Sequence, residues 1–451
     1  MMTSATQVGT VALVLLCGTA VAGETAGADL VCSEITSVTS YASVDGYRAF
    51  SFGDVTCNFG DTPIVYNAST SEHPVFASTL YRIMDGRIEQ IGVGFAGHTF
   101  FPLQGNSCGI GCVTADLGSL GAGCSDTIGS ALSGSQGDLA PRSEIDPYSA
   151  DLPYPFTTFG VSGNPIYKRV KTPADSLAES GAIYFVERQY ISAAETTDAA
   201  RNNNASYRRL EVNQSNGGVN LAGPTMQQRA AIYAWADHGL GVNTPDPSVM
   251  ISEIQIPNDG ILHLGSKVTD LGNGTYRYDY AVHNQNSALG VGSIRIPVQG
   301  SAPTSLGFNG IEYLDAPDNA ISSTAWTTSF GSGFVTWETE DYESNINANA
   351  IRWGTMYNFS LVSDRGPVTA EVELGMFQSG GAESVIGLAV TPGGVACDAD
   401  LTGDGNLNFL DVSAFLSSFA AMDPAVDFEF DGQFNFLDVS AFLSLFAAGC
   451  P

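Results

Sequence analysis

The sequence predicts a mainly β protein, a loop-rich β body with an antiparallel β-sandwich, followed by a small α-helical module at the C-terminus. Glycine is abundant, with 51 residues in 451, and charged residues make up only 14%, a composition typical of turn-rich β proteins. Between residues 250 and 390 apolar and polar residues alternate, as in half-buried strands. The last 55 residues instead contain a repeat with helical spacing.

The N-terminus reads as a secretory signal. An apolar run, Val8–Leu16, is followed by the small residues Ala20 and Ala22, which predicts cleavage before Gly23. Cys17 raises the alternative of a lipoprotein, but Leu16 lies where lipid processing needs a small residue. We therefore expect a signal peptide over 1–22, and a secreted, extracellular or cell-surface protein. No later run reaches the roughly 18 apolar residues of a membrane helix, so we expect no membrane insertion.

The rest of the chain divides at proline-rich points, because proline interrupts both helices and central strands. Two prolines fall in Asn243–Pro247, and Pro392 is followed by two glycines. The predicted units are a β-rich N-terminal domain at 23–249, a β-sandwich at 250–390, a linker at 391–396 and the C-terminal module at 397–451.

Several strands follow from local patterns. The apolar run Ala182–Val186 predicts a strand, and Val368–Leu374 alternates apolar and polar residues. The segments 261–268 and 275–284 flank an Asn273-Gly274 turn, which predicts a β-hairpin. The run Ala230–Ala236 fits a strand or a buried helix equally well.

The net charge of the chain restricts the classes of partner that it can bind. With 17 Lys and Arg against 47 Asp and Glu, the net charge of −30 argues against nucleic acid or an anionic membrane. Nine of the acids, and no Lys or Arg, fall within 397–451. This distribution favours divalent cations as ligands of the C-terminal module.

That module is an internal duplication. Asn408–Ala421 and Asn435–Ala448 are identical at 13 of 14 positions. Each copy follows an acidic loop with the spacing of a twelve-residue calcium loop, which needs oxygens at positions 1, 3, 5, 7, 9 and 12 and Gly at position 6. The twelve predicted ligands of two Ca²⁺ sites are Asp400, Thr402, Asp404, Asn406, Asn408 and Asp411, then Asp427, Glu429, Asp431, Gln433, Asn435 and Asp438. A pair of acidic surface turns is the alternative.

Each loop leads into an apolar helix, with Val412, Phe415, Leu416 and Phe419 on one face of the first and their equivalents on the second. We expect these faces to pack together. An arrangement of a loop followed by a helix, present twice, resembles a type I dockerin. The terminal Gly-Cys-Pro resembles the GC-type dockerin tails of secreted bacterial proteins. The resemblance implies anchoring to a cohesin-like or other cell-surface scaffold protein.

The module departs from scaffold-binding dockerins at loop positions 10 and 11. Those positions often hold small or hydroxyl residues, whereas this chain has Phe409-Leu410 and Phe436-Leu437. The difference predicts a more apolar docking surface. Because so small a module has little core, we also expect it to fold only with calcium.

The cysteines could form disulfide bonds or contribute to a zinc site. Cys108, Cys112 and Cys124 with His98 match a zinc ligand set, but in an exported protein we favour one disulfide among them. We expect Cys32 to pair with Cys57. A bridge between Cys397 and Cys450 would tie the ends of the repeat.

Catalytic signals are sparse. The sequence contains no Gly-x-Ser-x-Gly, His-Glu-x-x-His or phosphate-loop motif. The charged groups that could serve a glycosidase are Arg142, Glu144 and Asp146, and Asp237 with His238, although surface charge is the simpler reading. Three tryptophans, Trp326, Trp337 and Trp353, fit either sugar stacking or the core.

The body resembles uncharacterised secreted proteins that carry dockerin tails, in stretches such as YRIMDGRIEQIG (81–92) and NANAIRWGTMYNF (347–359). This resemblance brings no assigned activity. Two hypotheses follow for the body: a structural or binding module, for glycan or protein, or a polysaccharide-active hydrolase, the commonest cargo of dockerins.

Overall fold

The computed structural model describes residues 25–67, 70–98, 100–213, 215–298, 302–312, 321–394, 399–402, 407–428 and 432–449. The predicted signal peptide, 1–22, lies outside these residues. As the sequence predicts, the protein is mainly β, with antiparallel sheets and two longer helices near the C-terminus. None of the described helices is long and apolar enough to cross a membrane.

The N-terminal unit is built on one large antiparallel sheet, whose strand order is β1-β2-β10-β5-β4-β11-β12-β13. Its strands are β1 (Leu30–Ser40), β2 (Tyr47–Asn58), β4 (Val75–Met84), β5 (Arg87–Val93), β10 (Val170–Pro173), β11 (Ile183–Ile191), β12 (Ala205–Asn213) and β13 (Gly218–Met226), with the short β6 (Ala96–His98), β8 (Ser125–Ile128) and β9 (Leu139–Ala140) alongside. The predicted strand at 182–186 is the start of β11.

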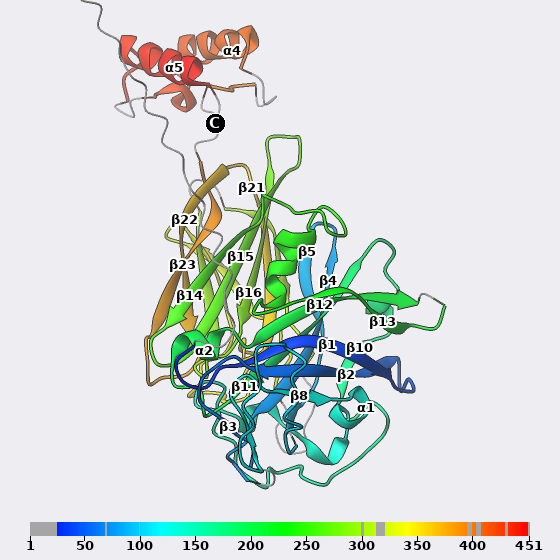
Figure 1. Cartoon of the computed structure of the whole chain (residues 1–451). Helices are drawn as coiled ribbons and strands as arrows, with labels where there is room; N and C mark the ends of the chain where they lie inside the picture. The colour runs from blue at the N-terminus through cyan, green and yellow to red at the C-terminus, as the bar shows by residue number, and fades with distance from the viewer. Residues whose placement is uncertain are drawn as a thin grey trace, which may run out of the picture.

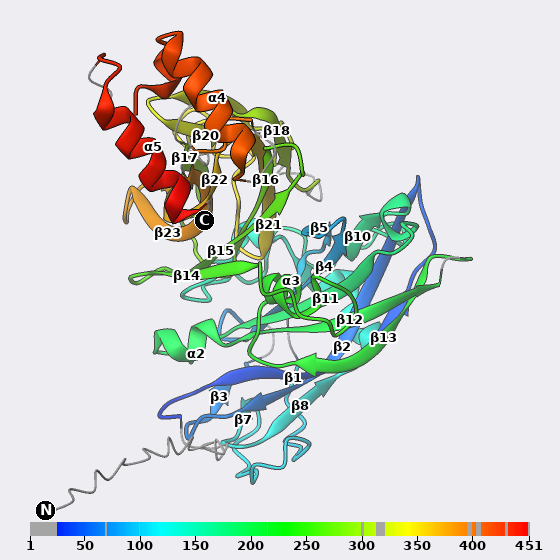
Figure 2. The same ribbon diagram turned by 90° about the horizontal axis from the view of Figure 1, so that it is seen from above.

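The two ends of this sheet meet. The Ser206 hydroxyl of β12 donates to the Cys32 carbonyl of β1 at 2.7 Å, and the Ile35 amide donates to the Thr225 hydroxyl of β13 at 3.0 Å. Figure 2 shows β1 beside β13. The sheet therefore curls like a barrel around an apolar core that includes Phe50, Tyr66 and Val186.

Shorter elements cover this sheet. They are the paired strands β3 (Ile64–Val65) and β7 (Ser119–Leu120), the helices α1 (Ser130–Ser133), α2 (Asp198–Asn202) and α3 (Ala234–His238), and the 3-10 turns η1 (Gln136–Asp138), η2 (Arg142–Glu144), η3 (Asp175–Leu177) and η4 (Ala231–Tyr233). The ambiguous run 230–236 is thus helical, formed by η4 and the start of α3.

The second unit is a sandwich of two five-stranded antiparallel sheets. One sheet has the order β14 (Met250–Ile256), β15 (Gly260–Asp270), β16 (Tyr276–Asn284), β21 (Thr355–Ser363) and β18 (Thr304–Asn309). The other has the order β19 (Thr327–Gly331), β20 (Phe334–Glu338), β17 (Val291–Pro297), β22 (Gly366–Met376) and β23 (Ser384–Gly394). The predicted hairpin is β15 and β16, and β23 extends into the stretch expected to be a linker, 391–396.

The sandwich core contains alternate residues of each strand. Tyr278, Tyr280 and Val282 of β16 are buried between the two sheets, as their spacing predicts. Trp326 and Trp337 lie in the same core, which leaves neither ring available for sugar stacking.

The sheet that contains β16 packs on both faces. Its outer face meets the N-terminal unit in a second core, which joins Tyr81 and Phe185 to Ala281 and Met356 around the fully buried Trp235. The Trp235 indole N–H donates to the Gly86 carbonyl at 2.8 Å. Figure 1 shows β14, β15 and β16 between the second sandwich sheet and the N-terminal strands. The two units therefore share buried surface.

The C-terminal module has a separate small core. It consists of α4 (Phe409–Ala420), the 3-10 turn η5 (Pro424–Val426) and α5 (Phe436–Ala448), and Figure 1 shows the two helices apart from the sheets. Phe415 and Phe442 stack with ring centres 4.1 Å apart. Leu416 and Leu443 do not join this core as expected, because each turns outward and is 58% and 51% exposed.

The cysteines of the N-terminal unit form two disulfides, Cys57–Cys108 and Cys112–Cys124. The expected Cys32–Cys57 pair is wrong. In the β1–β2 register Cys32 lies opposite Thr56 whereas Cys57 lies opposite Val31, so the two side chains point to different faces of the sheet. Cys32 is a buried free thiol, and burial raises its pKa. Cys397 and Cys450 lie outside the described residues.

Candidate functional site

The first predicted calcium loop is closed by Asp411. One of its carboxylate oxygens accepts hydrogen bonds from the Thr402 amide at 3.0 Å and hydroxyl at 2.8 Å, and the other accepts from the Asn408 amide at 2.9 Å. Burial acts to raise the pKa of this carboxyl, but the amide bonds from Asn408 and Thr402 lower it below its ordinary value. Asp411 therefore ties the two ends of the loop to the start of α4.

Two predicted ligands, Asp400 and Asp411, contact the hydroxyl of a third, Thr402. Thr402 also contacts Asp400, with its Oγ1 3.2 Å from the Asp400 carboxylate, so two carboxylates share one hydroxyl group. The Asn408 side chain caps α4 by accepting from the Leu410 amide at 2.8 Å. Asp404 and Asn406 lie outside the described residues.

The second loop repeats the contacts that the first makes at the start of its helix. The Asn435 amide donates to Asp438 at 2.8 Å, and the Asn435 side chain caps α5. At the start of the loop, Asp427 accepts a 2.8 Å bond from the amide of Gly432, five residues on, which folds the loop back on its first residue. Gln433 belongs to this loop, whereas Glu429 and Asp431 lie outside the described residues.

The donor set fits a hard divalent cation, because all the predicted ligand atoms are oxygens and carboxylates lie close together in the first loop. Among the described residues, no group of three or more His, Cys, Asp or Glu side chains is arranged to hold a metal. Each loop has two predicted ligands outside that part of the chain. When bound, calcium would neutralise the clustered carboxylates, while Asp411 and Asp438 orient the loop toward its helix.

A repeated apolar surface adjoins the loops. Phe409 and Leu410 are 78% and 58% exposed, and Phe436 and Leu437 are 77% and 55% exposed. Each pair begins its helix directly after the capping asparagine, so the cap fixes where these side chains stand. Together with the outward Leu416 and Leu443, these Phe-Leu pairs form two matched apolar patches, one on each helix.

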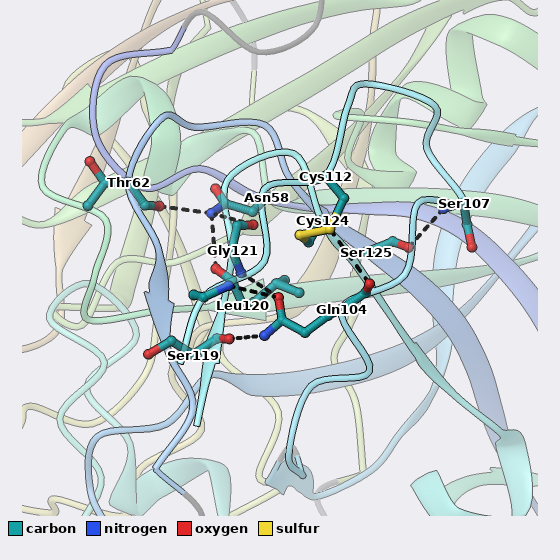
Figure 3. The surroundings of a disulfide bond; sticks show 11 residues. Asn58, Thr62, Gln104, Ser107, Cys112, Ser119, Leu120, Gly121, Cys124 and Ser125 are labelled. Atoms are coloured by element: carbon teal, nitrogen blue, oxygen red, sulfur yellow. Dashed lines mark hydrogen bonds between the residues drawn. A yellow bond between two sulfur atoms is a disulfide. The ribbon is translucent and has the colours of Figure 1, made fainter. Parts of the chain in front are cut away.

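The zinc alternative does not hold. Cys108, Cys112 and Cys124 are each bonded to another cysteine, and the His98 ring lies against His73, with ring centres 3.6 Å apart and planes tilted by 33°. Figure 3 shows the Cys112–Cys124 bond within a loop braced by polar side chains. The side-chain amide of Asn58, at the end of β2, donates to the Leu120 and Gly121 carbonyls of that loop at 3.3 Å.

The charged groups considered for catalysis have structural partners. Arg142 donates to the carbonyls of Gly94, Ser78 and Gly354 at 2.8 to 2.9 Å. Glu144 accepts from the Thr157 amide and hydroxyl, and one Asp146 oxygen accepts two amides at 2.9 Å. Both oxygens of Glu144 are therefore occupied.

The pair Asp237 and His238 is also structural. Asp237 forms a two-bond ion pair with Arg229 at 2.8 and 2.9 Å and accepts from the Tyr207 hydroxyl at 2.5 Å. The His238 ring accepts from the Asn243 amide at 2.8 Å. Both side chains therefore have hydrogen-bond partners within the fold.

Arg142, Glu144, Asp146 and Trp353 nevertheless line one cleft of about 320 Å³, between the 141–151 loop and the sandwich. Sequence reasoning grouped the first three but could not place them beside Trp353, which is over 200 residues away. Trp353 is 5% exposed, and its indole N–H donates to the Arg142 carbonyl at 2.9 Å. The cleft forms where the two units meet, so no local sequence pattern indicates it.

Comparison with known proteins adds no assignment. No protein-family model matches the chain, and no curated protein matches it. One matching solved structure comes from a study of the inhibition of the exo-β-D-glucosaminidase CsxA. It shares 10% identity, with a TM-score of 0.15, and the match covers 79% of this chain and 26% of that one. A TM-score this low carries no argument about fold or activity.

Proposed function

We propose that this is a secreted protein that attaches to a scaffold protein, of the cohesin-like kind, through its C-terminal module in a calcium-dependent manner. The observation that carries the proposal is the duplicated arrangement of an acidic loop, a capped helix and an exposed Phe-Leu pair. Four large apolar side chains at two equivalent positions are exposed to water at a cost in free energy, which supports a binding role.

Calcium has a structural role in this proposal. Without a cation, the repulsion between Asp400 and Asp411 opposes the loop geometry that positions Phe409 and Leu410. With calcium bound, the loops hold both Phe-Leu pairs in place, so docking and metal binding are coupled. The disulfides of the body support an extracellular location, since such bonds persist in oxidising compartments.

The docking surface can be tested with the full chain. Phe409→Ser with Phe436→Ser should abolish calcium-dependent binding to a cohesin-type module, measured by surface plasmon resonance with calcium and with excess chelator. Met422→Ser is the matched control, because Met422 is 69% exposed in the same module but lies outside the repeated pairs. Binding that persists in chelator, or that survives the double substitution, would contradict the proposal.

The two loops should differ in calcium affinity. The first has three carboxylates and the second has four, because Glu429 takes the position that Thr402 has in the first. More carboxylate charge favours tighter binding, so we expect the second loop to fill first. Calorimetry of Asp427→Ala should lose the tighter event and Asp400→Ala the weaker one. Loss of the tighter event in Asp400→Ala would reverse the order.

A further inference from the structure

The 320 Å³ cleft between the two body units has walls of different origin. The 141–151 loop, with Asp146 and Asp151, forms the N-terminal wall. The sandwich wall includes Arg352 and Phe377. Clefts at such junctions are common binding sites for small molecules, and this volume lies at the lower end of their range.

The cleft is held in shape by Arg142. Its guanidinium donates to Gly94 and Ser78 on the N-terminal side and to Gly354 on the sandwich side. The same guanidinium lies 5.2 Å from the centre of the Trp353 ring. These contacts fix the two walls relative to one another, so a ligand would meet a preformed site.

The sandwich wall presents an incompletely bonded cation. The Arg352 Nη2 donates to the carbonyls of Ile346 and Ala348 at 2.7 and 3.2 Å, and the guanidinium stacks on Phe377 at 5.1 Å. Among the described residues, its buried Nε has no acceptor, and no carboxylate lies within 4.0 Å of this guanidinium. A negatively charged acceptor would complete its bonding.

The N-terminal wall presents the opposite charge. Asp146 uses only one oxygen in hydrogen bonds to the Tyr148 and Ser149 amides. Asp151 is exposed, and its carboxylate has no hydrogen bond or ion pair among the described residues. The two walls thus carry opposite charges that do not pair with each other across the cavity.

Between these charges the lining is apolar. Ile145, Phe95 and Phe377 line the cleft and are 5%, 7% and 6% exposed. An apolar group of the ligand would cover this surface without facing a polar partner.

We propose that the cleft binds a small zwitterion with an apolar side chain, of the α-amino acid class. Its carboxylate would accept from Arg352, its ammonium would donate to Asp146 and Asp151, and its side chain would pack near Ile145. Such a ligand is neutral overall, so the net charge of −30 does not repel it. This site is independent of the function proposed for the C-terminal module.

Calorimetry of the full chain with calcium tests the proposal, with L-leucine as the probe. L-leucine should bind saturably, and N-acetyl-L-leucine and L-leucinamide, which each lack one charge, should bind at least about tenfold more weakly, as expected for the loss of one charge-assisted hydrogen bond. Asp151→Asn and Arg352→Gln should each weaken L-leucine by at least about tenfold. Asp364→Asn, an exposed acid at the far end of β21, should leave binding unchanged.

Equal binding of L-leucine and its two blocked forms would overturn the proposal, because the charges would then have no role. Binding of a β-linked glucose disaccharide without L-leucine, or of neither probe, would also overturn it. Arg352 has structural bonds to two carbonyls, so its variant could unfold. In that case Asp151→Asn decides the matter, since its exposed side chain has no described partner.

Discussion

Neighbouring residues of β11 place opposite charges on opposite faces of the N-terminal sheet. Arg188 points into the barrel-like interior and pairs with Asp54 at 2.6 Å, and both side chains are about 1% exposed. Glu187 points to the sandwich, where it lies 3.6 Å from His283. Sequence analysis recognised this strand but none of these buried charges, because partners 134 and 96 residues away leave no local pattern.

Removing one partner of the Arg188 pair should strongly destabilise the protein. Asp54→Ala leaves a buried guanidinium unpaired, so we expect the free energy of unfolding to fall by about 3 to 5 kcal/mol. The control is Glu211→Ala, since Glu211 pairs with Arg209 on the surface and is 66% exposed. That change should cost less than about 1 kcal/mol. Equal losses in urea unfolding would show that burial of the pair is unimportant.

Stability should also fall in mild acid because of His263. Burial, and then the nearby His283, lower the pKa of His263 to about 4, against the opposing effects of the hydrogen bond with Gln285 and of the Glu253 and Glu187 carboxylates. The unfolded chain binds this proton near pH 6.5, so stability decreases as the pH falls from 6.5 to about 4. The full loss is about 3 kcal/mol.

His263→Gln removes this titration and should flatten the dependence of unfolding free energy on pH over the same window. Urea unfolding at several pH values, for both proteins, measures the difference. An unchanged slope in the variant would assign the acid sensitivity to other groups.

At the scale of elements, strands with regular alternation were predictable and cross-links were not. The hairpin of β15 and β16 follows from a turn and a two-residue period, both of which are local. The Cys57–Cys108 pair depends on how a 51-residue excursion returns to β2, which no spacing rule provides. The calcium ligands stay a prediction that rests on a local spacing, whereas the cleft at Trp353 joins segments from both units.

The two disulfides should contribute unequally to stability. Cys57–Cys108 closes a span of 51 residues and Cys112–Cys124 a span of 12, so the first restricts the unfolded chain more. We expect Cys57→Ser with Cys108→Ser to cost about 1 kcal/mol more than Cys112→Ser with Cys124→Ser. Thermal unfolding of the two variants tests this order, and the reverse order would mean that local packing outweighs chain entropy.

At the scale of the molecule, the body should behave as one folding unit and the C-terminal module as another. A fragment ending at residue 249 would expose the face of the N-terminal sheet that covers Ala281 and Met356. We expect this fragment to be insoluble or unfolded by near-ultraviolet circular dichroism. A fragment ending at 394 should melt within a few degrees of the full chain, because the module has its own core around Phe415 and Phe442. A soluble, cooperatively melting 249-residue fragment would contradict this view.

The sheet that contains β16 is covered by both units, and this limits how the gene can recombine. A recombination event near Asn243–Pro247 would separate β14, β15 and β16 from the strands that cover them, and would leave an uncovered apolar face on both products. The body can therefore be passed between genes only as a whole, despite the proline-rich sequence at its centre. The helical repeat beyond Gly394 has its own core, so we expect that it can be gained, lost or attached to a different body without loss of either fold.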